Sequence, residues 1–326
     1  MKLRIGYKLC SEERSAPELV DDARRAEDAG FDFAAISDHF HPWTDTQGES
    51  PFVWSVIGAI AHATERLEIG TAVTCPTGRI HPAIVAQAAA TAATLLPGRF
   101  WLGVGTGENL NEHITGSAWP DTTTRREMLH EAVHVMRRLW SGELVTHRGG
   151  SFRVETARLY SLPETVPRVF VAAGGETAAH LAAEMGDGLI TTSPDPAVVG
   201  AFTDAGGTGP RLAELSVSFD EDESKALKTV LRCWPLAGIP GELPAELPLP
   251  RHFEQAAEMV RQEDVRDKVV AGADVRRYLK QIKTYVDAGL DHVFLHQVGR
   301  KQEPFFHFAK QELLPAVRRE FTAAAA

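Results

Sequence analysis

Short runs of apolar and β-branched residues alternate with amphipathic stretches along most of the chain. Eight runs have the length and composition of buried strands: residues 3–8, 33–37, 67–73, 100–105, 169–173, 188–192, 215–219 and 292–296. Between them the spacing of apolar positions predicts helices over residues 17–30, 52–63, 82–95, 123–140, 176–185 and 275–288. A hairpin is expected over residues 145–154, where the alternation is interrupted.

This alternation indicates the fold class. Parallel neighbouring strands need crossover connections, so strands interleaved with helices favour a parallel sheet. Eight such strands permit closure into a (β/α)8 TIM barrel, and barrels of this length form one domain. We therefore expect a single barrel domain over residues 1–326. An open, doubly wound sheet is the alternative.

One stretch breaks the rhythm. Residues 235–264 begin with five prolines in 16 residues, at positions 235, 240, 244, 248 and 250. This density predicts an insertion without regular structure, between a late strand and its helix. Such loops lie at the carboxyl-terminal mouth of a barrel and cover or shape the substrate site.

Charge and composition exclude several classes of function. The formal net charge of −10 argues against a nucleic-acid partner, because phosphate binding needs a basic face. The three cysteines form no CxxC pair, which is typical of a reducing compartment. No stretch is apolar for the length of a membrane span, and the first residues do not resemble a signal peptide. We expect a cytoplasmic protein without a membrane partner.

In a barrel, functional side chains lie at the carboxyl ends of the strands. The second predicted strand ends in Asp38, His39, His41 and Trp43, where a neutral imidazole is suited to take a proton from a hydroxyl group. A structural histidine is the alternative reading. His39 and His41 could also form a metal pair, but no third ligand stands out, and no metal site is predicted.

The ends of two later strands are rich in glycine. The string Gly103–Glu108 follows the fourth strand and differs from a dinucleotide fingerprint, because its third glycine falls one place early and no helix clearly opens there. Gly174 and Gly175 directly precede a predicted helix, so free amides and the helix dipole could hold a phosphate. A solvated loop acid at Glu108 and an ordinary helix start after Gly175 are the alternatives. No serine or cysteine nucleophile is paired with a base.

These strings resemble a known family. Ile36-Ser37-Asp38-His39-Phe40, Pro42-Trp43, Gly103-Val104-Gly105-Thr106-Gly107-Glu108, Ala118-Trp119-Pro120 and Ala172-Ala173-Gly174-Gly175 are similar to motifs of the F420-dependent glucose-6-phosphate dehydrogenases. That family belongs to the luciferase-like barrel superfamily. The similarity covers about residues 3–193 and returns near residues 285–295.

The resemblance implies a role for each matching residue. His39 would be the base that deprotonates the substrate hydroxyl, Glu108 would protonate the reduced ring nitrogen of coenzyme F420, and Trp43 would line the reacting face. A non-proline cis peptide would lie behind the ring at Ala72–Val73. The family also implies a homodimer. The positions that match contacts to the cofactor are Asp38, Ala72, Val73, Thr106, Gly107, Asn111, Gly174, Gly175, Glu176 and Thr177.

The sequence departs from the family where the substrate phosphate would bind. Asp195 and Gln255 stand where lysines are expected, so glucose 6-phosphate is doubtful and an unphosphorylated alcohol fits equally well. The expected reaction is an F420-dependent oxidation of an alcohol or sugar hydroxyl. Two alternatives remain: an F420H2-dependent reductase of an enone, imine or ketone, and an FMN-dependent monooxygenase of the same superfamily.

Overall fold

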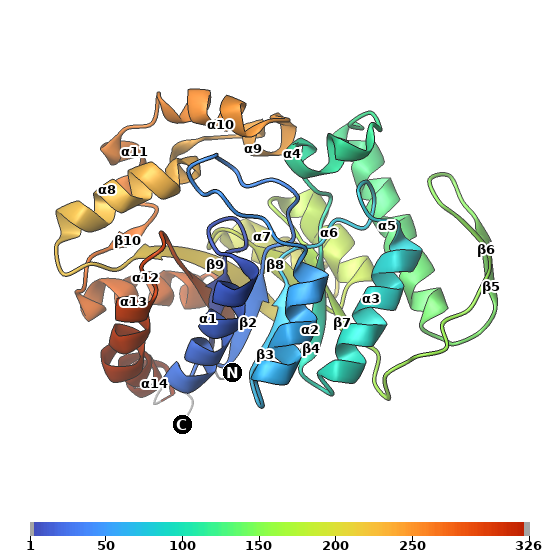
Figure 1. Cartoon of the computed structure of the whole chain (residues 1–326), viewed down its shortest axis with the longest axis horizontal. Helices are drawn as coiled ribbons and strands as arrows, with labels where there is room; N and C mark the ends of the chain where they lie inside the picture. The colour runs from blue at the N-terminus through green and yellow to red at the C-terminus, as the bar shows by residue number, and fades with distance from the viewer. Residues whose placement is uncertain (1–2, 323–326) are drawn as a thin grey trace.

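The protein is a closed parallel barrel, in a computed structural model that describes residues 3–322 (Figure 1). Each strand pairs in parallel with its neighbours, and contacts of β9 with β8 and of β11 with β1 close the ring. The strands are β1 (Arg4–Leu9), β2 (Phe33–Ile36), β3 (Glu68–Thr71), β4 (Phe100–Val104), β7 (Arg168–Ala172), β8 (Gly188–Thr191), β9 (Arg211–Ser218) and β11 (His292–Gln297). The predicted TIM barrel is confirmed, and the open sheet is excluded.

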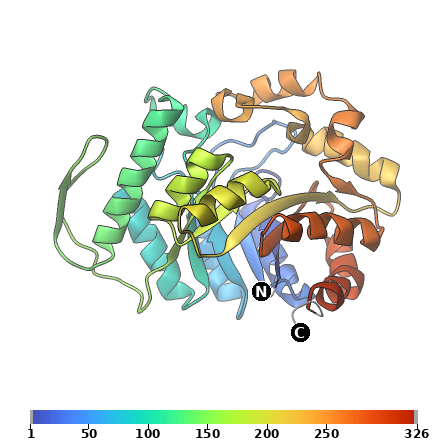
Figure 2. The same cartoon turned by 180° about the vertical axis from the view of Figure 1, so that it is seen from behind.

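Helices surround the barrel and match the predicted ones closely (Figures 1 and 2). The seventh strand begins four residues earlier than predicted, and the helices after β8 and β9 were not predicted. Apart from the four-residue α4 (Asn109–Glu112), the α-helices outside the insertion are α1 (Ala16–Ala29), α2 (Val53–Ala63), α3 (Pro82–Leu95), α5 (Thr122–Leu139), α6 (Glu176–Met185), α7 (Pro196–Asp204), α8 (Glu223–Cys233), α12 (Val275–Asp287), α13 (Glu303–Phe308) and α14 (Leu314–Thr322). Within residues 3–322, no helix is both long and apolar enough to cross a membrane.

Alternation along the strands builds two layers of core. One set of side chains faces the helices, while the other fills the barrel with aromatic and branched residues. Trp101 fills so much of the interior that a Cβ on the neighbouring Gly70 would lie 2.0 Å from its ring. Glycine at this position therefore lets the barrel close around a large side chain.

The proline-rich insertion contains regular structure, so the expectation of an irregular loop was wrong. It holds a 3₁₀ turn (Pro235–Gly238), α9 (Leu243–Glu246), α10 (Pro250–Ala257) and α11 (Gln262–Arg266), followed by β10 (Val270–Ala271), which pairs with β9. Pro235, Pro244 and Pro250 each stand in the first turn of a helix. Proline is tolerated there because the first amides of a helix have no intrahelical acceptor. The insertion follows α8 rather than its strand.

Two smaller elements lie between β4 and β7 along the chain. The predicted hairpin forms as β5 (Val145–Arg148) and β6 (Arg153–Ala157) and extends away from the barrel (Figure 2). A short helix, α4 (Asn109–Glu112), opens directly after the glycines that follow β4. The sequence did not predict this helix, because four residues carry no helical periodicity. In Figure 1, α4 lies beside α9 of the insertion.

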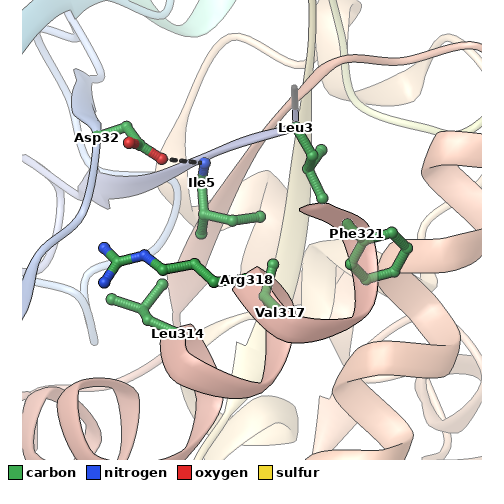
Figure 3. A pocket seen from close by; sticks show the side chains of 7 residues that line it. All are labelled: Leu3, Ile5, Asp32, Leu314, Val317, Arg318 and Phe321. Atoms are coloured by element: carbon green, nitrogen blue, oxygen red, sulfur yellow. Dashed lines mark hydrogen bonds between the residues drawn. The ribbon is translucent and has the colours of Figure 1, made fainter. Parts of the chain in front are cut away.

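A small pocket lies at the opposite end of the barrel (Figure 3). Its volume of about 30 Å³ leaves room for little more than water. Figure 3 shows Asp32 accepting a hydrogen bond from the backbone of Ile5 at the start of β1. The pocket is lined by α14, by the start of the chain's first strand and by the residue before β2: Leu3, Ile5, Asp32, Leu314, Val317, Arg318 and Phe321. Chemistry in barrels occurs at the other end, so this pocket is not the candidate site.

Candidate active site

His39 lies at the end of β2 and is held from behind by a buried carboxylate. Its Nδ1 atom is 2.8 Å from Oε1 of Glu12, which follows β1. The other oxygen of Glu12 accepts hydrogen bonds from the hydroxyl of Ser37 at 2.6 Å and the thiol of Cys10 at 3.2 Å. A carboxylate at Nδ1 orients the ring and favours the tautomer whose Nε2 atom can accept a proton.

The surroundings of His39 strengthen it as a proton acceptor. Burial by itself disfavours the imidazolium ion, but the charge and hydrogen bonding of Glu12 outweigh burial and raise the pKa of His39 above its ordinary value. Glu108 raises the pKa of His39 further, while Lys8 opposes it. The ring therefore holds a proton more firmly than a free histidine does.

Glu108 faces His39 across a narrow gap. Its Oε2 atom is 3.9 Å from Nε2 of His39, too far for a direct hydrogen bond. The Glu108 side chain is 29% exposed, and the backbone carbonyl of Glu108 accepts hydrogen bonds from the backbone N–H groups of Asn111 and Glu112 in α4. Asn111, one turn into α4, donates to Glu108 at 3.4 Å and accepts from the backbone N–H groups of Phe40 and His41. The loops after β2 and β4 are thereby fixed to each other.

Trp43 joins the histidine to the insertion. Its ring centroid lies 5.0 Å from that of His39 in an edge-to-face arrangement. It also contacts Phe253 of α10 at 5.2 Å and Trp234 at 6.4 Å between ring centroids. These aromatic rings belong to a separate apolar cluster at the mouth. The insertion therefore packs directly on a predicted site residue.

Asp38 is tied into the protein by its own neighbours. It accepts hydrogen bonds from the Thr74 hydroxyl at 2.7 Å and from Arg79 at 2.8 Å, and its side chain is fully buried. The predicted contact between this carboxylate and the cofactor stays a prediction.

Glu112 accepts the backbone N–H of Arg79 at 2.5 Å. Burial raises the pKa of Glu112 to about 7, against the opposing effect of Arg79.

The glycines after β4 pack against the loop that follows β3. A Cβ on Gly105 would lie 2.7 Å from Val73, and one on Gly107 would lie 2.6 Å from the sulfur of Cys75. The peptide bond between Ala72 and Val73 is cis, as the family resemblance implied. Thr106 lies half-buried between the two glycines. Contact with the protein itself thus explains these glycines.

Gly174 and Gly175 differ, because nothing in the protein explains them. A Cβ on either glycine would meet no atom of residues 3–322 within 4 Å. Gly175 caps α6 without any side-chain hydrogen bond, and Glu176 and Thr177 are exposed in its first turn. The open amides and the space before them fit an anionic group such as a phosphate.

The family described as luciferase-like monooxygenase matches residues 4–292. The chain belongs to the luciferase-like monooxygenase family.

Among relatives of this luciferase-like chain are proteins named F420-dependent glucose-6-phosphate dehydrogenase. The one from Nocardia farcinica is 38% identical over 97% of this chain and 98% of that protein. The one from Mycolicibacterium smegmatis is 37% identical over 98% of this chain and 99% of that protein. A solved F420-dependent secondary alcohol dehydrogenase, in complex with an F420-acetone adduct, is 31% identical, covers 98% of this chain and 100% of that chain, and has a TM-score of 0.91.

Sequence reasoning brought together His39, Trp43 and Glu108, but it missed parts of this luciferase-like site. The sequence prediction did not include Glu12. Glu12 follows β1, and functional side chains are expected at the carboxyl end of that strand as much as at the ends of later strands. Arg79 and Phe253 could not be found, because their roles depend on contacts across the mouth. Nδ1 of His41 is hydrogen-bonded to the carbonyl of Leu110 at 2.8 Å, and the expectation of no metal at His39 and His41 stays a prediction.

Proposed function

We propose that the chain is an F420-dependent oxidoreductase that transfers a hydride between a hydroxyl-bearing carbon and the deazaflavin ring of F420. The observation that carries this proposal is His39, backed by Glu12 at 2.8 Å and facing Glu108 at 3.9 Å beneath Trp43. Relatives and a solved neighbour with 31% or higher identity are named for F420. Their full-length coverage supports the same cofactor and reaction type here.

The residues present fit such a cofactor. The open amides after Gly174 and Gly175 would hold its phosphate, and the cis peptide Ala72–Val73 would support one face of the ring. When bound, F420 supplies a carbon that accepts or returns a hydride. Contacts from the remaining predicted positions belong to this proposal: Asp38, Thr106, Gly107, Asn111, Glu176 and Thr177.

The chain's own residues would handle the protons. Nε2 of His39 takes the substrate hydroxyl proton, and Glu12 stabilises the resulting imidazolium ion. Glu108, on the other side of the gap, would hold the proton that a bound deazaflavin needs at its ring nitrogen. Trp43 and the aromatic rings packed on it exclude water. The same residues serve the reverse reduction, so the direction of transfer depends on the substrates supplied.

We propose that the substrate is an alcohol that does not require a phosphate group. Asp195 caps α7 by accepting the backbone N–H of Ala197 at 2.9 Å, and it is exposed. Gln255 is exposed on α10. Neither side chain supplies the positive charge that phosphate binding favours. The aromatic cluster around Trp43 suits an apolar substrate body.

The test is whether the protein reduces F420 when it is supplied with a panel of simple alcohols, sugars and sugar phosphates. The reduction is measured as the loss of the visible absorbance of F420. We expect turnover with at least one unphosphorylated alcohol. His39→Ala should lower the turnover rate by about 10²–10⁴-fold. The control is His113→Ala, because His113 is a half-buried histidine on the 3₁₀ turn after α4. Full turnover in His39→Ala would refute the role of His39. Binding of FMN in preference to F420 would refute the cofactor.

Three further expectations belong to this proposal, and the first of them rests on the family resemblance. A homodimer is proposed, and light scattering on the purified protein measures its mass directly. A cytoplasmic location is proposed because Cys10, Cys75 and Cys233 are free thiols, as is usual in a reducing compartment, and fractionation of the source cells tests it. The single-domain organisation also stays a prediction, which one cooperative unfolding transition would support.

A further inference from the structure

Three potential metal ligands meet behind the proposed active site. Cys10, Glu13 and His296 are all buried, and one ligand atom from each lies within 4.8 Å of the other two. We propose that these residues form a binding site for a divalent transition-metal ion of the zinc class. The proposal does not depend on F420. Cys10 and Glu13 follow β1, and His296 ends β11, so the site would join the first and last strands of the barrel.

His296 presents a free nitrogen to this site. Its Nδ1 atom lies 3.1 Å from Oε1 of Glu214, whose other oxygen accepts from Lys8 at 2.7 Å. A proton on Nδ1 leaves a lone pair on Nε2, and Nε2 is buried without a hydrogen bond to any described residue. Histidines that ligate metals nearly always donate their other N–H to such a carboxylate or carbonyl.

Glu13 presents a free oxygen. Its Oε2 atom accepts the backbone N–H of Gly299 at 2.8 Å, while its Oε1 atom is buried without a hydrogen bond. The amide of Gln47 is near enough to interact with Glu13, yet its Nε2 atom also forms no hydrogen bond. A buried polar atom without a partner destabilises the folded chain, and a cation bound at Oε1 of Glu13 would remove this cost.

Charge favours a divalent ion here. Glu12, Glu13 and Glu214 are all buried in this region. Glu12 pairs with His39 and Glu214 with Lys8, whereas Glu13 forms no ion pair with any described residue. Buried carboxylates need compensating positive charge. Zinc bound by a thiolate, a carboxylate and a neutral imidazole makes a site of zero net charge, and the thiol proton of Cys10 leaves to solvent on binding.

Ligand chemistry and geometry point to zinc among the divalent ions. Thiolate and imidazole are ligands that zinc prefers over magnesium or calcium. Tetrahedral zinc separates its ligand atoms by roughly 3.3–3.7 Å, so side-chain rotations that move these atoms by about an ångström would close the site. Water would supply the fourth ligand.

The position of the site indicates a supporting role. The ring centroids of Trp234 and His296 are 4.7 Å apart. Glu12, which lies between the ligands Cys10 and Glu13 in the sequence, contacts His39. The ion would fix the end of β1 against β11 and so hold Glu12 in place. It would not touch the proposed substrate.

The experiment measures metal in the full-length protein, purified without a histidine tag. Elemental analysis after gel filtration should find zinc equimolar with the chain. Replacement by cobalt(II) should give a thiolate-to-cobalt charge-transfer band in the near ultraviolet. Cys10→Ser should abolish that band and Glu13→Gln should lower metal content, while Cys75→Ser, which changes a buried cysteine elsewhere, should retain both.

Several results would overturn the site. One is wild-type protein that takes up no stoichiometric zinc or cobalt, which would mean that Glu13 is satisfied by a proton or by Gln47. Another is a charge-transfer band that persists in Cys10→Ser. If Cys10→Ser fails to fold, as judged by circular dichroism, the wild-type metal content and the Glu13→Gln variant still decide the matter. Failure to bind F420 would leave all these readouts unchanged.

Discussion

At the scale of single residues, the site depends on charged side chains that are buried in pairs. Arg79 pairs with Asp38, Glu12 with His39, and Lys8 with Glu214. Removing one member of such a pair leaves the other charge buried and costs about 3–5 kcal/mol. The pairs are therefore poor targets for alanine substitutions, and isosteric changes report function more cleanly.

Glu112 should make stability depend on pH. Burial raises its pKa to about 7 in the folded protein, whereas an unfolded glutamate titrates near 4.3. A pKa raised by folding gives stability that is full below the unfolded pKa and is lost as pH rises through the folded pKa. Between pH 5 and pH 8, the wild type should therefore lose roughly 2–3 kcal/mol more unfolding free energy than Glu112→Gln loses.

Chemical denaturation at the two pH values, on wild type and variant, measures this difference. The exposed Glu263 of α11 provides a control, because Glu263→Gln should leave the pH dependence unchanged. Identical pH dependence in wild type and Glu112→Gln would contradict a raised pKa.

At the scale of elements, the start of α6 should bind the cofactor phosphate. Gly174→Ala adds a methyl group where the protein has no atom within 4 Å, so the free energy of unfolding should hardly change. The same methyl group would stand in front of the open amides, and losing one charge-assisted hydrogen bond of about 1.5–3 kcal/mol weakens F420 binding by about 10–100-fold.

Fluorescence titration of F420 measures this affinity. Gly200→Ala in α7 is the matched control, since a Cβ there also meets no atom but lies on another helix. Unchanged affinity in Gly174→Ala would move the phosphate away from α6.

The proline-rich insertion should loosen when its one fully buried aromatic side chain is removed. Phe253 has no exposed surface and packs on Trp43, and truncating a buried Phe to Ala costs about 3–5 kcal/mol. Because this cluster is separate from the barrel core, Phe253→Ala should speed proteolytic cleavage within residues 235–266 first. The control is Met259→Ala, because Met259 is 74% exposed. Cleavage of Phe253→Ala at the wild-type rate would contradict the prediction that Phe253 holds the insertion in place.

Elements also show how far sequence reasoning reached. Strands were predictable because buried parallel strands are continuous apolar runs, such as Phe33–Ile36. The insertion was misjudged because proline density was taken to exclude helices, although Pro250 stands where proline favours a helix start. His39 and Glu108 were found from strand ends and family motifs. The cluster of Cys10, Glu13 and His296 was not, because only barrel closure brings together residues from the two ends of the sequence.

At the scale of the whole molecule, binding of the right cofactor must stabilise the folded chain. A ligand that binds only the folded state at a hundred times its Kd adds about 2.7 kcal/mol to the free energy of unfolding, which for a chain of this length raises Tm by a few degrees. The predicted sites for ring and phosphate lie after β3 and before α6, so binding of F420 would join strands on different parts of the barrel.

We therefore expect F420 to raise Tm in proportion to the logarithm of its concentration, and FMN at equal concentrations to have little effect. Differential scanning fluorimetry measures both. Gly174→Ala should show a smaller shift with F420 at each concentration, because its Kd is larger, although its own Tm without ligand matches wild type. A shift produced by FMN and not by F420 would favour the monooxygenase alternative. That result would leave the barrel and the buried pairs unaltered, because they were established without reference to either cofactor.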